Sequence, residues 1–134
     1  MNRKFTILYD GECGICSASA KLIESKDKKS LFEIIPYQNV NFQNFSNGLS
    51  RDLAEKSVIL IDNESNNYFI ASRAVFEIAK NLGGIYKLIG IIGANSFISS
   101  ILNPIYYLIA RQRRQISICL GLNACSVNYD KATT

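Results

Sequence analysis

Apolar residues form short, nearly continuous runs near the start of the chain and recur at helical spacing between them. Residues 5–9 are almost all apolar, which is typical of a short buried strand, and residues 31–35 form a second β-rich run that ends at Pro36. Between them, from residue 16 to about 29, apolar positions recur at the period of a helix. A connection of this length permits parallel pairing of the two strands. The pattern therefore predicts a βαβ unit.

The middle of the chain predicts a loop, a short helix and a hairpin. Residues 37–48 are rich in Asn and Gln and show no clear period, so we expect a long ordered loop there. Residues 49–56 are expected to form a short helix. The apolar runs 57–62 and 68–70 lie on either side of a turn-forming segment, which indicates two antiparallel strands.

Helices are expected for the rest of the chain. Ser72 is a suitable N-cap for the first of them, which two glycines at 83–84 should end. In the last of them Pro104 would occupy the favoured first position, with Asn103 as its cap. The three helices expected after the glycines should cover the sheet, and they span residues 85–92, 97–102 and 104–115.

The composition fits one domain with a modest positive charge. With 134 residues, of which 48% are hydrophobic, the chain can build one core but not two comfortable ones. We therefore expect a single α/β domain over residues 1–134, with about four strands and an extended helical C-terminal part. The 15 basic and 11 acidic side chains leave a charge of only +4, much of it in residues 26–29 and 111–114. Such clusters suit helix ends, and no nucleic-acid partner is expected.

The chain contains no histidine. This absence excludes Cys/His nucleophile pairs, Ser/His/Asp triads and zinc sites that mix cysteine with histidine. Thiols and carboxylates remain for most catalysis. If a metal binds, the obvious ligands are the four cysteines, although the second pair is spaced widely for a zinc knuckle. These cysteines are Cys13, Cys16, Cys119 and Cys125.

The hydropathy pattern predicts neither a signal sequence nor a transmembrane segment. The apolar run before Asp10 is too short for a secretory signal. Polar residues interrupt the stretch 85–109 before any run reaches the roughly 18 apolar residues of a membrane span. We therefore expect a cytoplasmic location. In that reducing compartment a cysteine pair is more often transiently oxidised than permanently bridged.

Cys13 and Cys16 lie where the first predicted strand gives way to the first predicted helix. A helix start supplies unpaired N–H groups and a partial positive charge, which favour a thiolate. A disulfide needs its Cβ atoms closer than two positions three apart within a helix, so Cys13 should lie at the cap and Cys16 in the first turn. The sequence predicts that Cys13 is exposed and attacks, while Cys16 is shielded and resolves the mixed disulfide. The alternatives are half of a metal site, or inert buried thiols in a noncatalytic interaction module.

The order strand, Cys-x-x-Cys at a helix start, strand, hairpin and helix is that of the thioredoxin fold. The chain also carries the motifs Tyr9-Asp10-Gly11-Glu12-Cys13-Gly14-Ile15-Cys16, Ala71-Ser72-Arg73-Ala74-Val75, Gly83-Gly84 and Ala124-Cys125. On these motifs, and over nearly its whole length, it resembles the DCC family of predicted thiol-disulfide oxidoreductases, named after an Asp and two cysteines. The resemblance implies a protein-disulfide reductase with no cofactor beyond its own Cys13/Cys16 disulfide. Its partners would be a disulfide-bearing protein or a small thiol, and a separate reductant.

Four further residues are candidates for roles beside the two thiols. Asp10 is expected either to take the proton of Cys16 during resolution or to bond amides of the Gly11–Cys13 turn. Ser57 stands where thioredoxins carry a cis-proline that helps to hold a partner's backbone, so it is a candidate substrate-binding residue, and a partner peptide would be held differently here or not at all. Ser72 is a helix cap or a site residue. Arg73 either offers positive charge to a thiolate or substrate anion, or is solvated at the surface.

Overall fold

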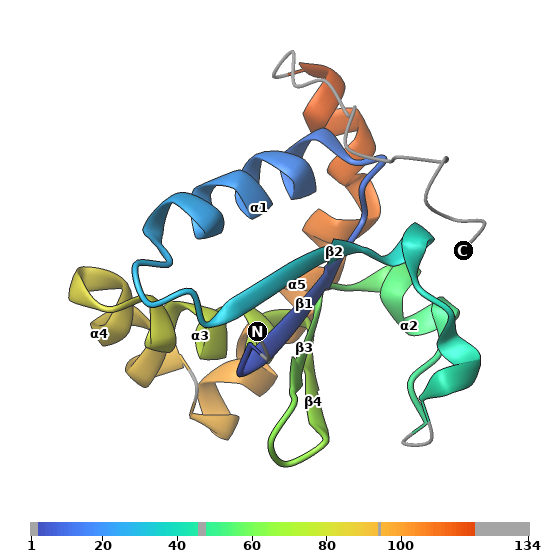
Figure 1. Ribbon diagram of the computed structural model, residues 1–134. Helices are drawn as coiled ribbons and strands as arrows, with labels where there is room; N and C mark the ends of the chain where they lie inside the picture. Colours follow the sequence, from blue (N-terminus) through green and yellow to red (C-terminus); the bar gives the residue numbers. More distant parts are fainter. Residues whose placement is uncertain (1–2, 46–47, 94, 120–134) are drawn as a thin grey trace.

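Four strands form a mixed sheet in the computed structural model, which describes residues 3–45, 48–93 and 95–119 (Figure 1). The strand order is β2-β1-β3-β4. The first two strands are parallel, as the sequence predicts, and β3 is antiparallel to both of its neighbours. The strands are β1 (Phe5–Tyr9), β2 (Phe32–Pro36), β3 (Ile59–Asp62) and β4 (Asn67–Ile70).

The register brings several chain segments to one edge of the sheet. Tyr9 at the end of β1 pairs with Pro36 at the end of β2, and Leu8 pairs with Ile59 at the start of β3. Ile59 in turn pairs with Ile70 at the end of β4. The loops after β1 and β2, the segment before β3 and the start of the helix after β4 therefore share this edge. Open α/β sheets carry their sites at such an edge.

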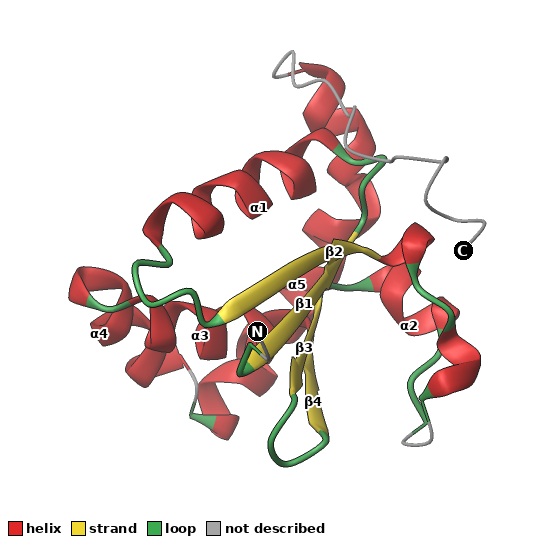
Figure 2. Cartoon of the chain, viewed as in Figure 1, coloured by secondary structure: helices red, strands yellow, loops and turns green. Residues whose placement is uncertain are grey.

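Helices cover both faces of the sheet (Figure 2). On one face Ile7, Phe32 and Leu60 pack with α1 and α3. On the other face Leu8 and Ile59 pack with α2 and with the 3-10 turns η1 and η2, which occupy the expected loop. This arrangement confirms the predicted thioredoxin-like α/β class. The elements are α1 (Gly14–Lys26), η1 (Tyr37–Asn39), η2 (Phe42–Asn44), α2 (Arg51–Lys56), α3 (Ala71–Leu82), α4 (Gly84–Gly93) and α5 (Ser96–Cys119).

The C-terminal helices differ from the prediction in two respects. They pack chiefly on other helices, α4 on α3 and α5 on α1 and α3, rather than on the sheet. Moreover, α5 continues through Pro104, and Asn103 lies inside it instead of capping a new helix. A proline inside a helix costs about 3 kcal/mol. Contacts of Ser99 and Asn103 with Ser72, and of Tyr106 with Val58, hold α5 on both sides of the proline and outweigh that cost.

The predicted cap of α3 is also wrong. The helix begins at Ala71, so that Ser72 lies inside its first turn, and the N-cap is Ile70, which makes no side-chain cap bond. The predicted end of the helix is confirmed. Gly83 caps the C-terminus at φ 83°, a backbone conformation that favours glycine.

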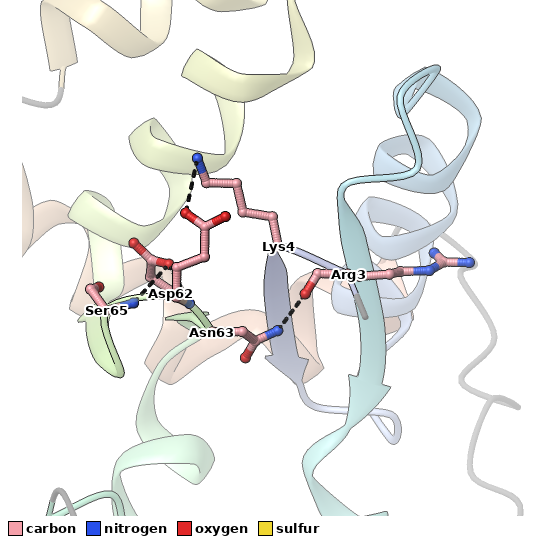
Figure 3. A network of polar contacts seen from close by, with 6 residues as sticks. Arg3, Lys4, Asp62, Asn63 and Ser65 are labelled. Atoms are coloured by element: carbon pink, nitrogen blue, oxygen red, sulfur yellow. Dashed lines mark hydrogen bonds and ion pairs between the residues drawn. The ribbon is translucent and has the colours of Figure 1, made fainter. Parts of the chain in front are cut away.

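The hairpin turn fastens the start of β1 (Figure 3). The Asn63 side chain donates to the Arg3 carbonyl at 2.8 Å, and the Asn63 amide donates to the Lys4 carbonyl at 2.9 Å. Beside it, Asp62 accepts bonds from the amides of Glu64 and Ser65 at 3.0 and 3.4 Å. Burial opposes ionisation of Asp62, but these bonds and the charge of Lys4 outweigh it and hold the carboxyl pKa below its ordinary value.

Length and hydropathy decide whether any helix in the described part of the chain could cross a membrane. None of them is by itself long and apolar enough to cross a membrane. Taken together, Gly84–Gly93 and Ser96–Gln112 are long and apolar enough to cross a membrane, but the pair is bent by 96° at the break between them.

Candidate functional site

The predicted cysteine positions are confirmed. Cys13 is the N-cap of α1, with an extended backbone (φ −99°, ψ 122°), and Cys16 lies in the first turn. The Cys16 amide donates to the Cys13 Sγ at 3.4 Å, while the Ser17 amide donates to the Cys13 carbonyl at 2.9 Å. The Cys13 sulfur therefore lies at the positive end of the helix, in contact with one of its N–H groups. Both features favour a thiolate there.

The predicted exposure of the two thiols is wrong. Cys13 is 1% exposed and Cys16 is half-buried, so the shielded sulfur belongs to the first cysteine. The physical reason is the cap geometry. The bond to the Cys16 amide turns the Cys13 side chain back over the first turn, whereas Cys16 projects from the helix and lines a cavity.

That cavity has a volume of about 340 Å³ and lies between α1, α3 and α5. Its lining is mostly apolar, with Ile15, Val58 and Ile78 among the residues that form it. The lining also includes the acidic residue Asp10 and the thiol residue Cys16. A group held in this cavity would therefore lie against aliphatic side chains with a thiol beside it.

Asp10 organises the loop that precedes the dithiol. It is 1% exposed, and its Oδ1 accepts bonds from the Glu12 amide at 3.0 Å and from the Gln38 Nε2 at 2.7 Å. Its carbonyl accepts from the Cys13 amide at 3.2 Å. The side chain thus makes a turn contact of the expected kind, with the amide of Glu12, which lies between Gly11 and Cys13.

Gln38 is a site residue that the sequence reasoning missed. Besides donating to Asp10, it accepts a bond from the Gly11 amide at 3.1 Å through its Oε1. One amide group therefore holds two neighbouring residues of the loop. The signal for it was present, because β1 and β2 were predicted to be parallel, and Gln38 follows the end of β2 as closely as Asp10 and Gly11 follow the end of β1.

Tyr37, which precedes Gln38, is a buried phenol beside the acidic loop. Burial raises the pKa of Tyr37, and the neighbouring carboxylates of Asp10, Glu55 and Glu12 raise it further. The Arg51 guanidinium, 5.6 Å from the ring, opposes this shift only in part. Tyr37 therefore remains a neutral phenol at neutral pH.

Ser57 lies at the sheet edge that carries the dithiol, and its contacts are internal. It is 1% exposed, and its hydroxyl donates to the Leu53 carbonyl at 3.1 Å, at the end of α2. The next residue, Val58, donates its amide to the Tyr106 hydroxyl at 2.9 Å, and its carbonyl accepts from the Ala71 amide at 3.2 Å. The backbone before β3 is therefore bonded to α5 and to the start of α3.

Ser72 and Arg73 are joined to α5. The Ser72 hydroxyl lies within hydrogen-bonding distance of the Ser99 carbonyl, at 3.2 Å, and of the Asn103 Oδ1. Arg73 donates to the Ser96 hydroxyl at 3.0 Å, and its guanidinium lies 5.4 Å from the centre of the Phe69 ring. Of the predicted site residues, the structure thus gathers Asp10, Cys13 and Cys16 in one loop, while the contacts of Ser72 and Arg73 are with α5 and β4.

The other two cysteines add little to this picture. Cys119 is the last residue of α5, and its side chain, like the whole of Cys125, lies outside the described residues. Within residues 3–45, 48–93 and 95–119, no three Cys, Asp or Glu side chains gather closely enough to hold a metal ion. The suggestion that the four cysteines bind a metal therefore stays a prediction.

A dithiol that begins the first helix of a β2-β1-β3-β4 sheet defines a thioredoxin-like thiol-disulfide protein. A family model, DCC1-like thiol-disulfide oxidoreductase, matches residues 7–119, and the chain belongs to this family. The match supports thiol-disulfide oxidoreductase as the class of activity. No curated protein and no solved structure matches the chain.

Proposed function

We propose that the protein is a disulfide reductase in which the Cys13 thiolate attacks the substrate. Attack forms a mixed disulfide between Cys13 and one substrate sulfur, and the other substrate sulfur leaves as a thiolate. Cys16 then attacks the Cys13 sulfur, closes the Cys13–Cys16 disulfide and releases the second substrate thiolate. Two electrons thus pass from the dithiol to the substrate, and a thiol reductant must return them. The observation that carries this order is the bond from the Cys16 amide to the Cys13 sulfur at the helix cap.

Asp10 is proposed as the acceptor of the Cys16 proton in the resolving step. Resolution requires Cys16 to lose its proton, and a nearby carboxylate can accept it directly or through water. The location of Asp10 and Cys16 on the lining of one cavity supports this role. The turn contact with Glu12 uses the same oxygen as the bond from Gln38, so Asp10 also holds the loop in place.

The substrate that the site fits best carries an apolar group next to its disulfide. An extended peptide is held in thioredoxins by the backbone before the third strand, and here Val58 donates its amide to Tyr106 instead. Ser57, although proposed as a substrate contact, donates its hydroxyl to Leu53. The apolar cavity beside Cys16 offers a surface at which a substrate group could bind. A small disulfide or one dedicated protein partner is therefore favoured over general protein disulfides.

The partial exposure of Cys16 supports the reverse order as a second candidate. Cys16 lines the cavity, whereas Cys13 is 1% exposed, so a substrate in the cavity would meet the Cys16 sulfur first. In this order Cys16 forms the mixed disulfide and Cys13 resolves it. As in the first order, two electrons pass from the dithiol to the substrate disulfide, whose two sulfurs leave as thiolates.

Single cysteine variants test the proposal and separate the two orders. Cys13→Ser should abolish disulfide reduction, and Cys16→Ser should accumulate a mixed disulfide on Cys13, detected by intact-mass spectrometry after reaction with an aromatic disulfide. Cys119→Ser is the matched control and should keep the activity of the wild type. A mixed disulfide that accumulates on Cys16 in Cys13→Ser would establish the reverse order.

Two results would contradict the proposal. One is equal disulfide reduction by the wild type and Cys13→Ser. The other is a stoichiometric content of zinc or iron in protein purified under reducing conditions, lost in Cys13→Ser, which would identify a cysteine-ligated metal module instead.

A further inference from the structure

The outer faces of α4 and α5 consist of large apolar side chains. On α4 the exposed positions recur at helical spacing, and Ile85 is 70% exposed. On α5 they continue in the same way, and Phe97 is 73% exposed. We call this set the outer apolar face: Ile85, Leu88, Ile89, Ile91, Ile92, Phe97, Ile101, Ile105, Leu108 and Ile109.

The inner faces of the same helices are made of small and polar residues. Gly90 and Gly93 are the buried residues of α4, and a Cβ at Gly90 would come within 2.2 Å of the Lys80 backbone nitrogen on α3. On α5 the buried Ser99 donates its hydroxyl to the Gly93 carbonyl at 3.2 Å. The fully buried positions are therefore small, while most of the large apolar side chains of both helices are exposed, the reverse of the usual surface helix. So many exposed apolar side chains on two neighbouring helices mark an interaction surface.

The charged residues of α4 and α5 themselves have one sign. No Asp or Glu occurs between Glu77 and Asp130, and the segment between them contains five basic residues. Two of these, Lys87 on α4 and Arg111 on α5, are exposed. A surface of apolar side chains flanked by cations is complementary to a layer that is apolar below and negatively charged on top.

We propose that the outer apolar face docks on the surface of a membrane that contains anionic lipids. This goes beyond the redox function and does not depend on it. Docking rather than spanning is favoured for each helix by itself, since α4 has 10 residues where a transmembrane helix needs about 20, and α5, with 24 residues, is not apolar enough. It also follows from packing, because the inner faces of both helices are already bound to the rest of the protein, α4 to α3 and α5 to α1 and α3.

Charge favours the membrane over a second copy of the chain. In a two-fold dimer the same patch meets itself, so Lys87 and Arg111 would approach cations of the other subunit. Anionic headgroups would instead neutralise these cations while the acyl region receives the isoleucine and leucine side chains. An anionic lipid surface is therefore the partner that satisfies both the apolar and the charged part of the face.

Vesicle sedimentation of the full chain tests the docking. The protein should sediment with vesicles of phosphatidylcholine and phosphatidylglycerol, and much less with phosphatidylcholine alone or at high salt. Leu88→Gln and Leu108→Gln should each weaken sedimentation roughly tenfold, because each removes an apolar side chain from the interface. Leu22→Gln is the matched control, since Leu22 on α1 is 50% exposed, close to the 60% of Leu88 and Leu108, but lies outside the face. It should bind like the wild type.

Several outcomes would overturn the proposal. One is the absence of sedimentation with anionic vesicles at low salt. Another is equal binding by Leu88→Gln, Leu108→Gln and the control, with circular dichroism showing that all three are folded. A third is a stable dimer in analytical ultracentrifugation that Leu88→Gln dissociates, without vesicle binding by the wild type. That result would assign the face to self-association.

Discussion

At the scale of single residues, the dithiol depends on a loop held by one glutamine. Gln38 donates to Asp10 and accepts from Gly11, so its amide replaces the water that both buried groups would otherwise need. Asp10 in turn holds the amide of Glu12, one residue before the Cys13 cap. Gln38 is thus a positioning residue, which acts on the thiols through the loop.

Replacing Gln38 should loosen this loop. We expect Gln38→Leu to lower the free energy of unfolding by about 1–3 kcal/mol, because Asp10 and Gly11 each lose a buried hydrogen-bond partner. Gln43→Leu is the control, because Gln43 lies in the same β2–α2 connection but is exposed, and it should change stability little. Urea unfolding measures both variants.

A second measurement separates positioning from stability alone. The pH profile of alkylation of the two thiols should shift in Gln38→Leu, since the Asp10 carboxyl and the α1 amides move relative to the sulfurs. An unchanged profile in a destabilised but folded variant would limit Gln38 to a structural role.

At the scale of elements, the contact of α4 with α3 leaves no room at two glycines. A Cβ at Gly90 would meet backbone atoms, the Lys80 nitrogen at 2.2 Å and the Phe76 carbonyl oxygen at 2.6 Å. A Cβ at Gly93 would meet the ring of Phe76 at 2.1 Å, which is a side chain. Backbone atoms of a packed helix cannot move aside, whereas a ring can rotate.

Gly90→Ala should therefore be more damaging than Gly93→Ala. We expect Gly90→Ala to lower the free energy of unfolding by about 1–3 kcal/mol through overpacking, although alanine favours a helix more than glycine. Gly93→Ala should cost less. Thermal unfolding of the two variants checks this order, and equal melting temperatures would show that α4 shifts freely on α3.

The β3–β4 hairpin carries a pH-dependent contribution to stability. The pKa of Asp62 is lower in the folded chain than its ordinary value, so the ionised carboxylate stabilises the fold above the ordinary pKa. That contribution is lost as the pH falls through the folded-state pKa. Asp62 therefore makes the fold less stable in acid, at the turn that fastens β1.

Asp62→Asn should reveal this contribution. We expect the variant to be less stable than the wild type at about pH 7, and the difference to be smaller at about pH 2, because the wild-type carboxyl takes up its proton as the pH falls through its lowered pKa. Glu64→Gln is the control, because its side chain is 72% exposed and its 3.6 Å ion pair with Lys4 contributes little. Urea unfolding at both pH values measures the effect, and a constant difference across this range would contradict it.

At the scale of the whole molecule, local pattern predicts the sheet well and the C-terminal helices less well. The apolar runs that became β1 and β3 are buried almost throughout, as their nearly continuous apolar sequence indicates. The continuation of α5 through Pro104 and the position of Ser72 inside α3 depend instead on contacts between residues about 30 positions apart. Those contacts exist only once the helices have packed.

The candidate site was likewise predictable from the sequence only in part. The cap position of Cys13 follows from the strand-to-helix boundary and the spacing of the pair, and it was predictable. The burial of Cys13 was not, because it depends on the direction that its side chain takes towards the Cys16 amide. The contacts of Ser57 and Val58 also required the fold, since the bond to Tyr106 joins residues 48 positions apart.

The bond from Val58 to Tyr106 makes α5 an extension of the sheet's own hydrogen-bond network. To slide or tilt, α5 would have to leave the Val58 amide without its partner at a buried edge, which costs about 1–3 kcal/mol. The helix and the sheet edge therefore move as one rigid body. Whatever surface the outer side of α5 rests on, the sheet edge that carries the two thiols is held at a fixed height above it, so the orientation of the whole protein on that surface determines from which side a substrate can approach.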